Sequence, residues 1–451
     1  MTTRVILVRH GQSTYNLKKL IQGQIDVSTL TDLGLAQARQ VGETLQGITF
    51  DGIYASPLKR AFQTAQTILS VIEAAQGGAP VLVTRENLKE IDLPLWEGYS
   101  FEQAQAEYPE QFHQWYHDPA NFSMTLADGS EFFPVRSLYE RAATFWQETL
   151  PHHSNHTLLV VAHSAINRAL IGTALGLGPN RHENLHQANC AISVLNFSGQ
   201  WGDAVQLESM NLTGHMGETL PALRSRHKGP RMLLVRHGET EWNRQKRFQG
   251  QIDIPLNENG KRQGEQAATF LKDVAIDAAA TSPLSRPKET AQIILQHHPA
   301  VALEDVEDLK EIGHGAWEGL YEQEIESGYP GLLAQWQAHP EAVQMPGPGG
   351  ENLDQVWSRS IAAWKLVVAQ YSDRDRPVTV LVTAHDAVNK AILCHIVGLG
   401  PESFWKFKQG NGAVSVIDYP DGVDSAPVLT AANLTMHLSG SIFDQTAAGA
   451  L

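Results

Sequence analysis

The sequence predicts an α/β protein with two tandem domains, each a mostly parallel β-sheet with helices on both faces. First, a chain of 451 residues suggests two or three domains, at roughly 100 to 200 residues each. Second, short β-branched runs alternate with helical patterns, which is typical of βαβ units. Third, the first half of the sequence returns in the second half. So long a period indicates duplicated domains, because solenoid repeats span only about 20 to 50 residues.

The two halves share the same short sequences in the same order. RVILVRHGQSTYN at 4–16 returns as RMLLVRHGETEWN at 231–243. Later, ASPLKRAFQTAQTIL matches TSPLSRPKETAQIIL, LKEIDLPLWEG matches LKEIGHGAWEG, and VVAHSAINRALI matches VTAHDAVNKAIL. The intervals between matching residues are nearly constant. We therefore expect domains at 1–217 and 231–451, joined by a linker at 218–230 that contains two prolines and several basic residues.

The individual elements of the first half can be read from their patterns. RVILVR, DGIYAS and TLLVVA are predicted strands, and TDLGLAQARQVGETLQ has the apolar spacing of a helix with Thr31 as its N-cap. Ser56 and Pro57 resemble an N-cap followed by proline at the first helical position. That start places Arg60 in the first turn of a helix, beside backbone amides that favour an anion.

The matching helix of the second half contains a proline. Pro287 follows Arg286, and a proline inside a helix removes a backbone hydrogen bond. We therefore expect this helix to begin later than its counterpart in the first half.

Composition excludes several classes of protein. Hydrophobic residues at 42% and charged residues at 18% indicate a globular chain. The net charge of −15 provides no basic surface for nucleic acid or an anionic membrane, so we expect neither as a partner. The apolar runs are far shorter than the roughly 20 residues of a membrane span. A strand-like run begins at once, which leaves no room for a signal peptide, and we expect a cytoplasmic protein.

No metal or other cofactor is expected. The histidines are separated by long intervals and lack a set of carboxylates or cysteines with ligand spacing. Cys190 and Cys394 lie in apolar surroundings in different halves, and neither belongs to a CxxC pattern. We expect both to be buried free thiols.

Each half places two histidines directly after apolar strands, His10 with His163 and His237 with His385. Open parallel sheets bind their ligands beyond the carboxyl ends of the strands, so the two histidines of each half are expected in one pocket. A single histidine in such a position is more often structural. Two in each half, both with arginines nearby, favour a catalytic role.

The surrounding residue types suit phosphoryl transfer. That reaction needs a nucleophile, fixed donors for the phosphate oxygens and an acid for the leaving group. Arg9 adjoins His10, and Arg60 opens the following helix, so both can donate paired hydrogen bonds to a phosphate. Taken singly, each of these residues is more often structural: Arg9 as a strand-end ion pair and Arg60 as a solvated helix residue. The same holds for Glu90, in LKEIDLPLWEG, as a surface carboxylate.

Taken in order, these motifs resemble the histidine phosphatase superfamily, which includes the cofactor-dependent phosphoglycerate mutases. In each half LVRHG is followed by QG, SPL-x-R, LKE, WEG and a strand-ended AH. The resemblance covers essentially the whole chain, twice, and implies two phosphoglycerate mutase-like domains. It implies the catalytic residues His10, Glu90, His163, His237, Glu311 and His385. It implies the substrate-binding residues Arg9, Asn16, Gln22, Gly23, Arg60, Arg236, Asn243, Gln249, Gly250 and Arg286.

The resemblance also implies a mechanism through a phosphohistidine. A neutral His10 attacks phosphorus in line while the two arginines and His163 hold the oxygens. Glu90 protonates the departing alkoxide and then deprotonates the attacking water. This dual role requires a raised carboxyl pKa, which a nearby phosphate favours and the arginines oppose.

The two halves differ in one loop before the second histidine. The second half keeps PGPGGENLDQVWSR at 346–359, close to the family pattern, whereas the first has LADGSEFFPVRSLYER at 126–141. Phe132, Phe133 and Pro134 change the size and polarity of that loop in the first half.

A further difference is Asp386, which follows His385 and either lowers the local positive potential or orients that histidine. All catalytic residue types are present twice, so two competent sites are expected. If only one works, the loop favours the second.

The expected partner is a small-molecule phosphate ester. The segments after the acid favour a hydrolase over a mutase, which needs a longer lid to keep water out. The tandem form is similar to the plant phosphatases of 2-carboxy-D-arabinitol 1-phosphate, so this or a related sugar (acid) phosphate is the expected substrate. The alternatives are a phosphoserine phosphatase, a phosphoglycerate mutase and a non-catalytic ligand-binding module.

The sequence leaves the substrate range and the oligomeric state open. Substrate choice depends on side chains near residues such as Trp96, Trp115, Phe132 or Trp317. The oligomeric state is undetermined, and the two halves are candidates for an internal pseudo-dimer.

Overall fold

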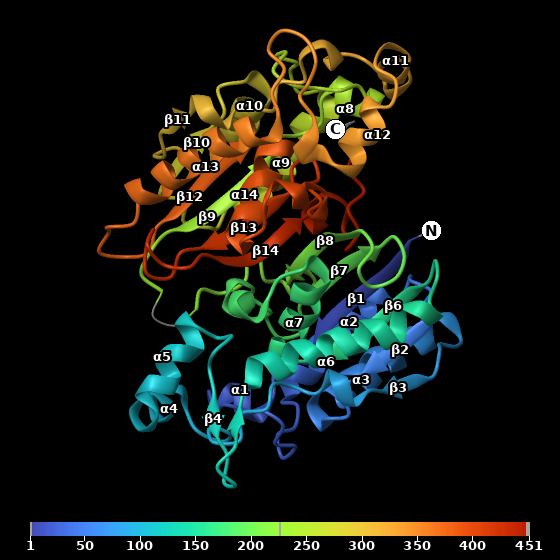
Figure 1. The fold of residues 1–451 in the computed structure, drawn as a ribbon, viewed down its shortest axis with the longest axis vertical. Helices are drawn as coiled ribbons and strands as arrows, with labels where there is room; N and C mark the ends of the chain where they lie inside the picture. The colour runs from blue at the N-terminus through green and yellow to red at the C-terminus, as the bar shows by residue number, and fades with distance from the viewer. Residues whose placement is uncertain (1, 225–226, 448–451) are drawn as a thin grey trace. The chain divides into compact units, whose positions relative to one another are not determined.

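The structure is a computed structural model that describes residues 2–224 and 227–447. The chain forms two compact units, Met1–Pro221 and Ala222–Leu451, which Figure 1 shows coloured along the sequence. The expected linker, 218–230, spans the boundary between these units. Its last part packs on the second unit, because the Lys228 amide donates a hydrogen bond of 2.8 Å to the Pro420 carbonyl.

The first unit is built on a mixed sheet with parallel strands at its centre. Its strand order is β8-β7-β1-β6-β2-β3. Strand β1 is parallel to β6 and antiparallel to β7, and β2 is parallel to both β6 and β3. The elements are β1 (Thr3–Arg9), α1 (Thr14–Leu17), α2 (Asp32–Leu45), β2 (Gly52–Ala55), α3 (Lys59–Gln76), β3 (Leu82–Thr84), α4 (Phe101–Glu107), α5 (Pro109–His117), β4 (Met124–Thr125), β5 (Glu131–Phe132), α6 (Pro134–Thr149), β6 (Thr157–Ala162), α7 (Ser164–Leu175), β7 (Ile192–Phe197) and β8 (Val205–Leu212).

The second unit repeats this topology. Its strand order is β11-β10-β12-β9-β13-β14, with β9 parallel to β12 and antiparallel to β13. The elements are β9 (Arg231–Arg236), α8 (Glu241–Gln245), α9 (Glu258–Leu271), β10 (Ala278–Thr281), α10 (Ser285–Leu295), β11 (Leu303–Asp305), α11 (Glu322–Gly328), α12 (Leu332–Ala338), α13 (Leu353–Gln370), β12 (Thr379–Ala384), α14 (Asp386–Val397), β13 (Val414–Asp418), β14 (Val428–Leu434) and α15 (Met436–Ser439).

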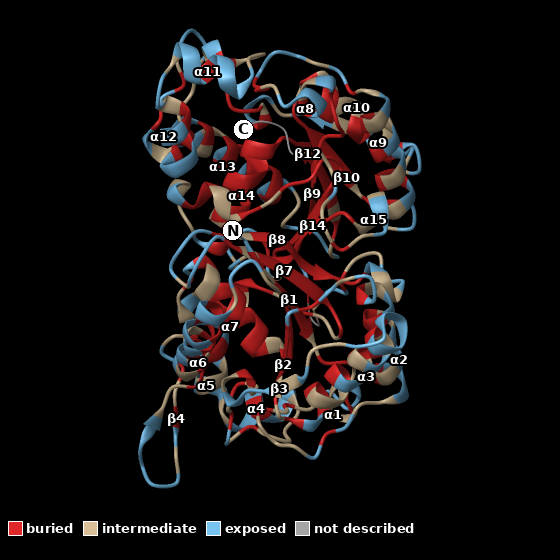
Figure 2. Ribbon diagram, turned by 90° about the vertical axis from the view of Figure 1, so that its right-hand side faces the viewer, coloured by how far each residue is buried: buried red, intermediate tan, exposed pale blue. Residues whose placement is uncertain are grey.

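Helices cover both faces of each sheet. In the first unit α2 packs against α3 and α6 packs against α7, and Figure 2 shows the two pairs on opposite sides of the strands. In the second unit the pairs are α9 with α10 and α13 with α14. The central strand β1 is buried from both sides, since Val5, Ile6, Leu7 and Val8 are all 0% exposed. The predicted α/β fold class is therefore confirmed.

The helix starts of the first unit confirm one predicted N-cap and correct another. Thr31 caps α2 as predicted, its side chain accepting from the Gly34 amide at 3.1 Å. Ser56 does not cap α3, however, because the helix begins at Lys59 and its N-cap is Leu58. The first amide of that helix is also occupied, since Lys59 donates to the Asp26 carboxylate at 2.6 Å.

The second helix with a predicted irregularity is α10, and it does not begin late. It starts at Ser285, the residue that matches Lys59 in the repeat. Pro287 is its third residue, and the first turn of a helix has amides with no intrahelical acceptor, so the missing N–H costs nothing there.

The tryptophans singled out in the sequence lie in the cores. Trp96, Trp115 and Trp317 are 2%, 8% and 0% exposed. Trp96 and Trp115 form an aromatic cluster with Phe122, at ring separations between 5.0 and 6.0 Å. Phe132 is instead part of the small β4–β5 hairpin, which follows the region 118–123 and precedes α6.

Candidate active site

The strand register brings the two histidines of each unit to the same edge of the sheet. Arg9, the last residue of β1, pairs with Ala162, the last residue of β6. His10 and His163 follow these residues, so both leave the sheet together, and their ring centroids are 5.1 Å apart. In the second unit Arg236 pairs with Ala384 in the same way, and the rings of His237 and His385 are 5.2 Å apart.

The first histidine of each unit is held in one tautomer. His10 Nδ1 lies 2.8 Å from the Gly11 carbonyl, and His237 Nδ1 lies 2.7 Å from the Gly238 carbonyl. A carbonyl oxygen can only accept, so Nδ1 must carry the proton and Nε2 keeps its lone pair. Burial, followed by the neighbouring arginines, lowers the pKa of both rings well below the usual histidine value. Both imidazoles are therefore neutral at neutral pH.

The second histidine of each unit is oriented by a serine. His163 Nε2 lies 2.8 Å from Ser56 Oγ, and His385 Nε2 lies 2.8 Å from Ser282 Oγ. Each serine comes directly after the neighbouring parallel strand, β2 or β10. Burial and then the helix arginine lower the pKa of these rings as well. Within the described residues, Nδ1 of both rings has no hydrogen-bond partner.

The helix arginines are fully buried and are aimed by carbonyl groups. Arg60 NH2 donates to the Gly23 carbonyl at 2.8 Å, and Arg286 NH2 donates to the Gly250 carbonyl at 2.8 Å. Both guanidinium groups are 0% exposed. Burial lowers the pKa of Arg286 to about 10, which leaves it charged at neutral pH.

The strand-end arginines are held by a second pair of carbonyl groups. Arg9 NH1 donates to Gln187 at 2.7 Å, and Arg236 NH1 donates to Gln409 at 2.6 Å. Nε of both arginines is buried and has no partner within the described ranges 2–224 and 227–447. A buried donor left without an acceptor is costly, so these atoms suit an anion that enters the site.

The two predicted acids rest on the first turn of the helix that follows the second histidine. Glu90 accepts from the amides of Ala165 and Ile166 in α7, at 3.1 and 3.2 Å. Glu311 accepts from the Ala387 amide in α14 at 3.2 Å. Burial, and secondarily the Asp386 carboxylate, raises the pKa of Glu311.

The predicted glutamines and glycines form a loop beneath the helix arginine. Gln22 Oε1 accepts from Ser13 Oγ at 2.8 Å, and Gln249 Oε1 accepts from Thr240 Oγ1 at 2.5 Å. Gly23 has a φ of +50°, and a Cβ there would lie 2.1 Å from Glu97 Oε1. A side chain at this position would therefore displace the loop whose carbonyl aims Arg60.

The asparagines belong to the same loop. Asn16 Oδ1 accepts from the Ser13 amide at 3.1 Å, which closes a capping box at α1, and Asn243 does the same with Thr240 in α8. In this way the structure brings all of the predicted site residues of each unit to one end of its sheet.

Several residues of the site were not predicted from the sequence motifs. Asn189 Nδ2 donates to the His10 carbonyl at 2.9 Å, and Asn411 Nδ2 donates to the His237 carbonyl at 3.2 Å. Arg141 donates to the Glu90 carbonyl at 2.9 Å, and its counterpart Arg359 donates to Glu311 at 2.9 Å. Each of these residues is identical in the two copies, so a comparison of the two halves of the sequence could have identified them.

Asp386 distinguishes the second site from the first. Its carboxylate lies 3.3 Å from Arg236 NH1 and 2.6 Å from Lys390 Nζ, and it is 2% exposed. It does not hydrogen-bond His385, whose Nε2 is bound by Ser282. Of the two roles expected for Asp386, lowering the local positive potential is therefore the one that the contacts support.

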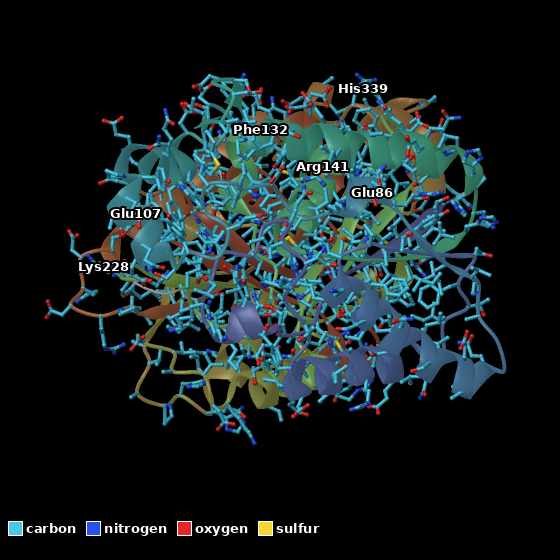
Figure 3. All side chains as sticks on the ribbon, turned by 90° about the horizontal axis from the view of Figure 1, so that it is seen from below. Glu86, Glu107, Phe132, Arg141, Lys228 and His339 are labelled. Carbon is cyan, nitrogen blue, oxygen red and sulfur yellow. The ribbon has the colours of Figure 1, made fainter. Side chains whose placement is uncertain are left out.

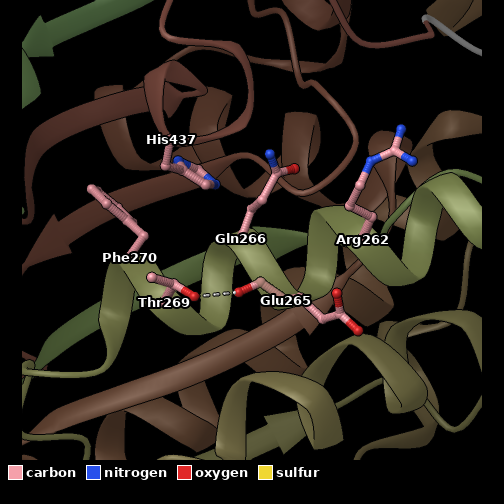
Figure 4. Close-up of a pocket in the computed structure, with 6 residues that line it drawn as sticks. All are labelled: Arg262, Glu265, Gln266, Thr269, Phe270 and His437. Atoms are coloured by element: carbon pink, nitrogen blue, oxygen red, sulfur yellow. Dashed lines mark hydrogen bonds between the residues drawn. The ribbon is translucent and has the colours of Figure 1, made fainter.

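A cavity elsewhere on the second unit does not coincide with this chemistry. It has a volume of about 390 Å³ and lies along α9, where His437 stacks on Phe270 with ring centroids 4.5 Å apart (Figure 4). None of the paired histidines or arginines lines it. The candidate active site is therefore assigned from the convergence of polar groups.

Within residues 2–224 and 227–447, no group of three or more His, Cys, Asp or Glu side chains is arranged to hold a metal ion. No helix in these ranges is long and apolar enough to cross a membrane. Cys190 and Cys394 are buried free thiols, as predicted.

Comparison with known families identifies the superfamily of the chain. The sequence pattern described as histidine phosphatase superfamily (branch 1) matches residues 5–211 and again 232–430. The chain belongs to this superfamily, as its motifs predicted, and it is a phosphatase that acts on a small phosphorylated metabolite.

Particular relatives fall into tandem and single-unit forms. The chain is 31% identical to the 2-carboxy-D-arabinitol-1-phosphatase of Triticum aestivum, over 96% of this chain and 86% of the relative. It is 33% identical to phosphoserine phosphatase 1 of Hydrogenobacter thermophilus, over 46% of this chain and 94% of the relative. Among solved structures, the phosphoserine phosphatase of Entamoeba histolytica, in complex with 3-phosphoglyceric acid, has 28% identity and a TM-score of 0.40; it covers 48% of this chain and 99% of that one.

Proposed function

We propose that each unit hydrolyses a phosphate monoester through a phosphohistidine on His10 or His237. The observation that carries this proposal is the pair of buried histidine rings, 5.1 and 5.2 Å apart, each flanked by two buried or half-buried arginines. Nε2 of His10 has a lone pair and can attack phosphorus in line. The guanidinium groups and the second histidine then hold the oxygens on which charge develops.

Glu90 and Glu311 are proposed as the general acids. The carboxyl group protonates the departing alkoxide and then takes a proton from the water that cleaves the phosphohistidine. Arg141 and Arg359 donate to the carbonyl groups of the two glutamates, which keeps both side chains over the helix that follows the second histidine. The raised pKa of Glu311 favours the protonated form that the first step requires.

The proposed substrate is 2-carboxy-D-arabinitol 1-phosphate or a related sugar (acid) phosphate. The support is the extent of the similarity to the wheat protein and to the Arabidopsis thaliana protein named a probable 2-carboxy-D-arabinitol-1-phosphatase, which includes both units. Phosphoserine is the second candidate, because a protein named for that substrate is as similar over a single unit. A phosphoglycerate mutase activity and a non-catalytic ligand-binding role are the remaining alternatives.

We also propose that the enzyme acts in the cytoplasm and needs no metal. Its nucleophile, donors and acid are all protein side chains, so activity is expected to survive a strong chelator. Complete loss of activity in the chelator, restored by a divalent metal, would contradict the proposed mechanism.

The proposal is tested by release of inorganic phosphate from a panel of small phosphomonoesters. The panel contains 2-carboxyarabinitol 1-phosphate, phosphoserine and phosphoglycerates, and the enzymes are the wild type, His10→Ala, His237→Ala and the double variant. Each single variant is expected to keep some activity and the double variant none. Full activity in the double variant would reject the phosphohistidine, and interconversion of phosphoglycerates without phosphate release would indicate a mutase.

A further inference from the structure

Each unit has a buried cation at the same position of the repeat, but the carboxylate that neutralises it comes from a different segment. In the first unit Arg168, in α7, pairs with Glu183 at 2.9 Å. In the second unit the matching residue is Lys390, in α14, and it pairs with Asp386 at 2.6 Å. The position of Glu183 is taken by Trp405, whose ring lies 4.5 Å from Lys390 Nζ.

This exchange has a physical reason. A cation with little contact with water needs a carboxylate partner, because an uncompensated buried charge is strongly destabilising. Trp405 cannot supply one. The carboxylate comes instead from Asp386, one turn before Lys390 in α14, where the first unit has Ser164.

The new position places the carboxylate at the phosphate site. Asp386 directly follows His385 and reaches Arg236 NH1 at 3.3 Å. Within residues 2–224 and 227–447, the matching Arg9 donates to the Gln187 carbonyl and makes no ion pair. One of the two arginines proposed to hold the phosphoryl oxygens is thus already paired with a carboxylate in the second unit.

The proposed nucleophile of the second unit is also engaged. Arg286 Nε donates to His237 Nε2 at 3.3 Å. The corresponding Nε of Arg60 has no partner in the described part of the chain. The lone pair that would attack phosphorus therefore accepts a hydrogen bond in the second unit.

We propose that Asp386 is a positioning residue that weakens phosphate binding at the second site, so that the first unit performs most of the hydrolysis. A phosphoryl dianion that enters beside Arg236 must compete with the carboxylate for the guanidinium and is repelled by it. This inference rests on the proposed phosphohistidine chemistry. It reverses the order of the two sites that the loop sequences favoured.

The effect should fall on binding more than on the chemical step. Asp386 acts on Arg236, which holds phosphate oxygens in the ground state as well as in the transition state. Removing its charge is therefore expected to lower KM and the inhibition constant of inorganic phosphate, while kcat changes less. A role in folding alone would not produce this pattern.

The test isolates each site in the full-length chain. His237→Ala reports the first site and His10→Ala reports the second, with p-nitrophenyl phosphate as substrate and inorganic phosphate as inhibitor. The first site is expected to have a kcat/KM at least about tenfold higher, a smaller factor than the loss of a whole oxyanion donor. Asp386→Asn, added to His10→Ala, is expected to raise the kcat/KM of the second site by about tenfold and to strengthen inhibition by phosphate.

A matched pair of variants in the first unit makes the test independent of how Asp386→Asn folds. Ser164→Asp, added to His237→Ala, places a carboxylate at the position that matches Asp386. Since Arg168 is already paired with Glu183, the new carboxylate is expected to act on Arg9. It is expected to raise KM and weaken phosphate inhibition by about tenfold, while Ser164→Asn leaves both nearly unchanged.

The outcomes separate this inference from the proposed function. Activity in the double histidine variant would reject the phosphohistidine itself. An inactive double variant with equal activity at the two sites, and no change in phosphate inhibition for either Asp386→Asn or Ser164→Asp, would overturn only the role of Asp386.

Discussion

The two units hold the same polar groups at nearly the same distances, yet they differ in how far those groups are covered. The paired rings are 5.1 and 5.2 Å apart, and both helix arginines meet a glycine carbonyl at 2.8 Å. The predicted residues Arg236, Asn243, Gln249 and Glu311 are all buried, with exposures of 3%, 4%, 5% and 3%. Their counterparts Arg9, Asn16, Gln22 and Glu90 are only partly buried. The catalytic geometry thus follows from the framework that both units share, whereas access depends on the segments around it.

One such segment is the loop before α13 in the second unit. A Cβ on Gly313 would lie 2.1 Å from the Gly349 carbonyl oxygen, so the loop packs directly on the backbone next to the acid. Its Glu351 accepts from the Gly313 amide and pairs with Arg359, both at 2.8 Å.

The first unit replaces this arrangement. Asp92 stands where the second unit has Gly313, and the β4–β5 hairpin replaces the loop. Burial raises the pKa of Asp92, and the positive charge of Arg141 opposes that shift. Figure 3 labels Arg141 and Phe132 in this region. Both units keep an arginine beneath the acid, but among the described residues only Arg359 forms an ion pair there, with Glu351.

The largest expected effect tests whether the helix arginine contributes equally to catalysis in both units. Arg60→Ala in the His237→Ala enzyme, and Arg286→Ala in the His10→Ala enzyme, should each lower kcat by about 10² to 10³, as for the loss of one oxyanion donor. The rate of phosphate release gives both numbers. Arg60→Lys and Arg286→Lys are the controls, since lysine keeps the charge without the planar fork. A loss confined to Arg60→Ala would show that the second site does not use its helix arginine.

The next effect concerns stability and sharpens the difference between the two arginines beneath the acids. Arg359→Ala leaves Glu351 without its cation and is expected to cost about 3 kcal/mol in the free energy of unfolding of the second unit. Arg141→Ala removes hydrogen bonds to two carbonyl groups and is expected to cost the first unit about 1.5 kcal/mol. Hydrogen exchange measured on peptides of each unit resolves the two values in the full-length chain. Equal losses would mean that the Glu351 pair adds nothing.

The smallest effect concerns a backbone position beside the phosphate site. Gly412 has a φ of +76°, and its amide donates to the Arg236 and His237 carbonyls. Gly412→Ala should cost the second unit about 1 kcal/mol, because a side chain is disfavoured in the left-handed region. Gly440→Ala is the matched comparison: Gly440 has a φ of +72° and open space around its Cβ, so it is expected to show the loss due to backbone conformation alone. The first unit tolerates Cys190 at the position of Gly412, with a φ of +53°, so an unchanged stability would show that the second unit shares this tolerance.

Much of this protein was determined by local sequence and by the repeat. The alternation of apolar strands and helices predicts the α/β class, and the two strand-ended histidines predict one site in each copy. Parallel strands that pair in register must deliver the residues that follow them to the same edge, so proximity of His10 to His163 can be inferred before any coordinate is known. Residue type then limits the chemistry to a nucleophilic imidazole, guanidinium donors and a carboxyl acid.

The tertiary structure decided what depends on contacts between distant segments. Ser56 was predicted to cap a helix, but its hydroxyl instead orients His163, from more than a hundred positions away. Likewise, Asp386 stands beside His385 in the sequence but binds Arg236, at the end of β9. Such pairings are set by strand register and helix packing, which act through space, and short sequence patterns describe only neighbours along the chain. The residue types and the fold can therefore be predicted from the sequence, whereas the ion pairs that distinguish the two sites depend on the tertiary structure.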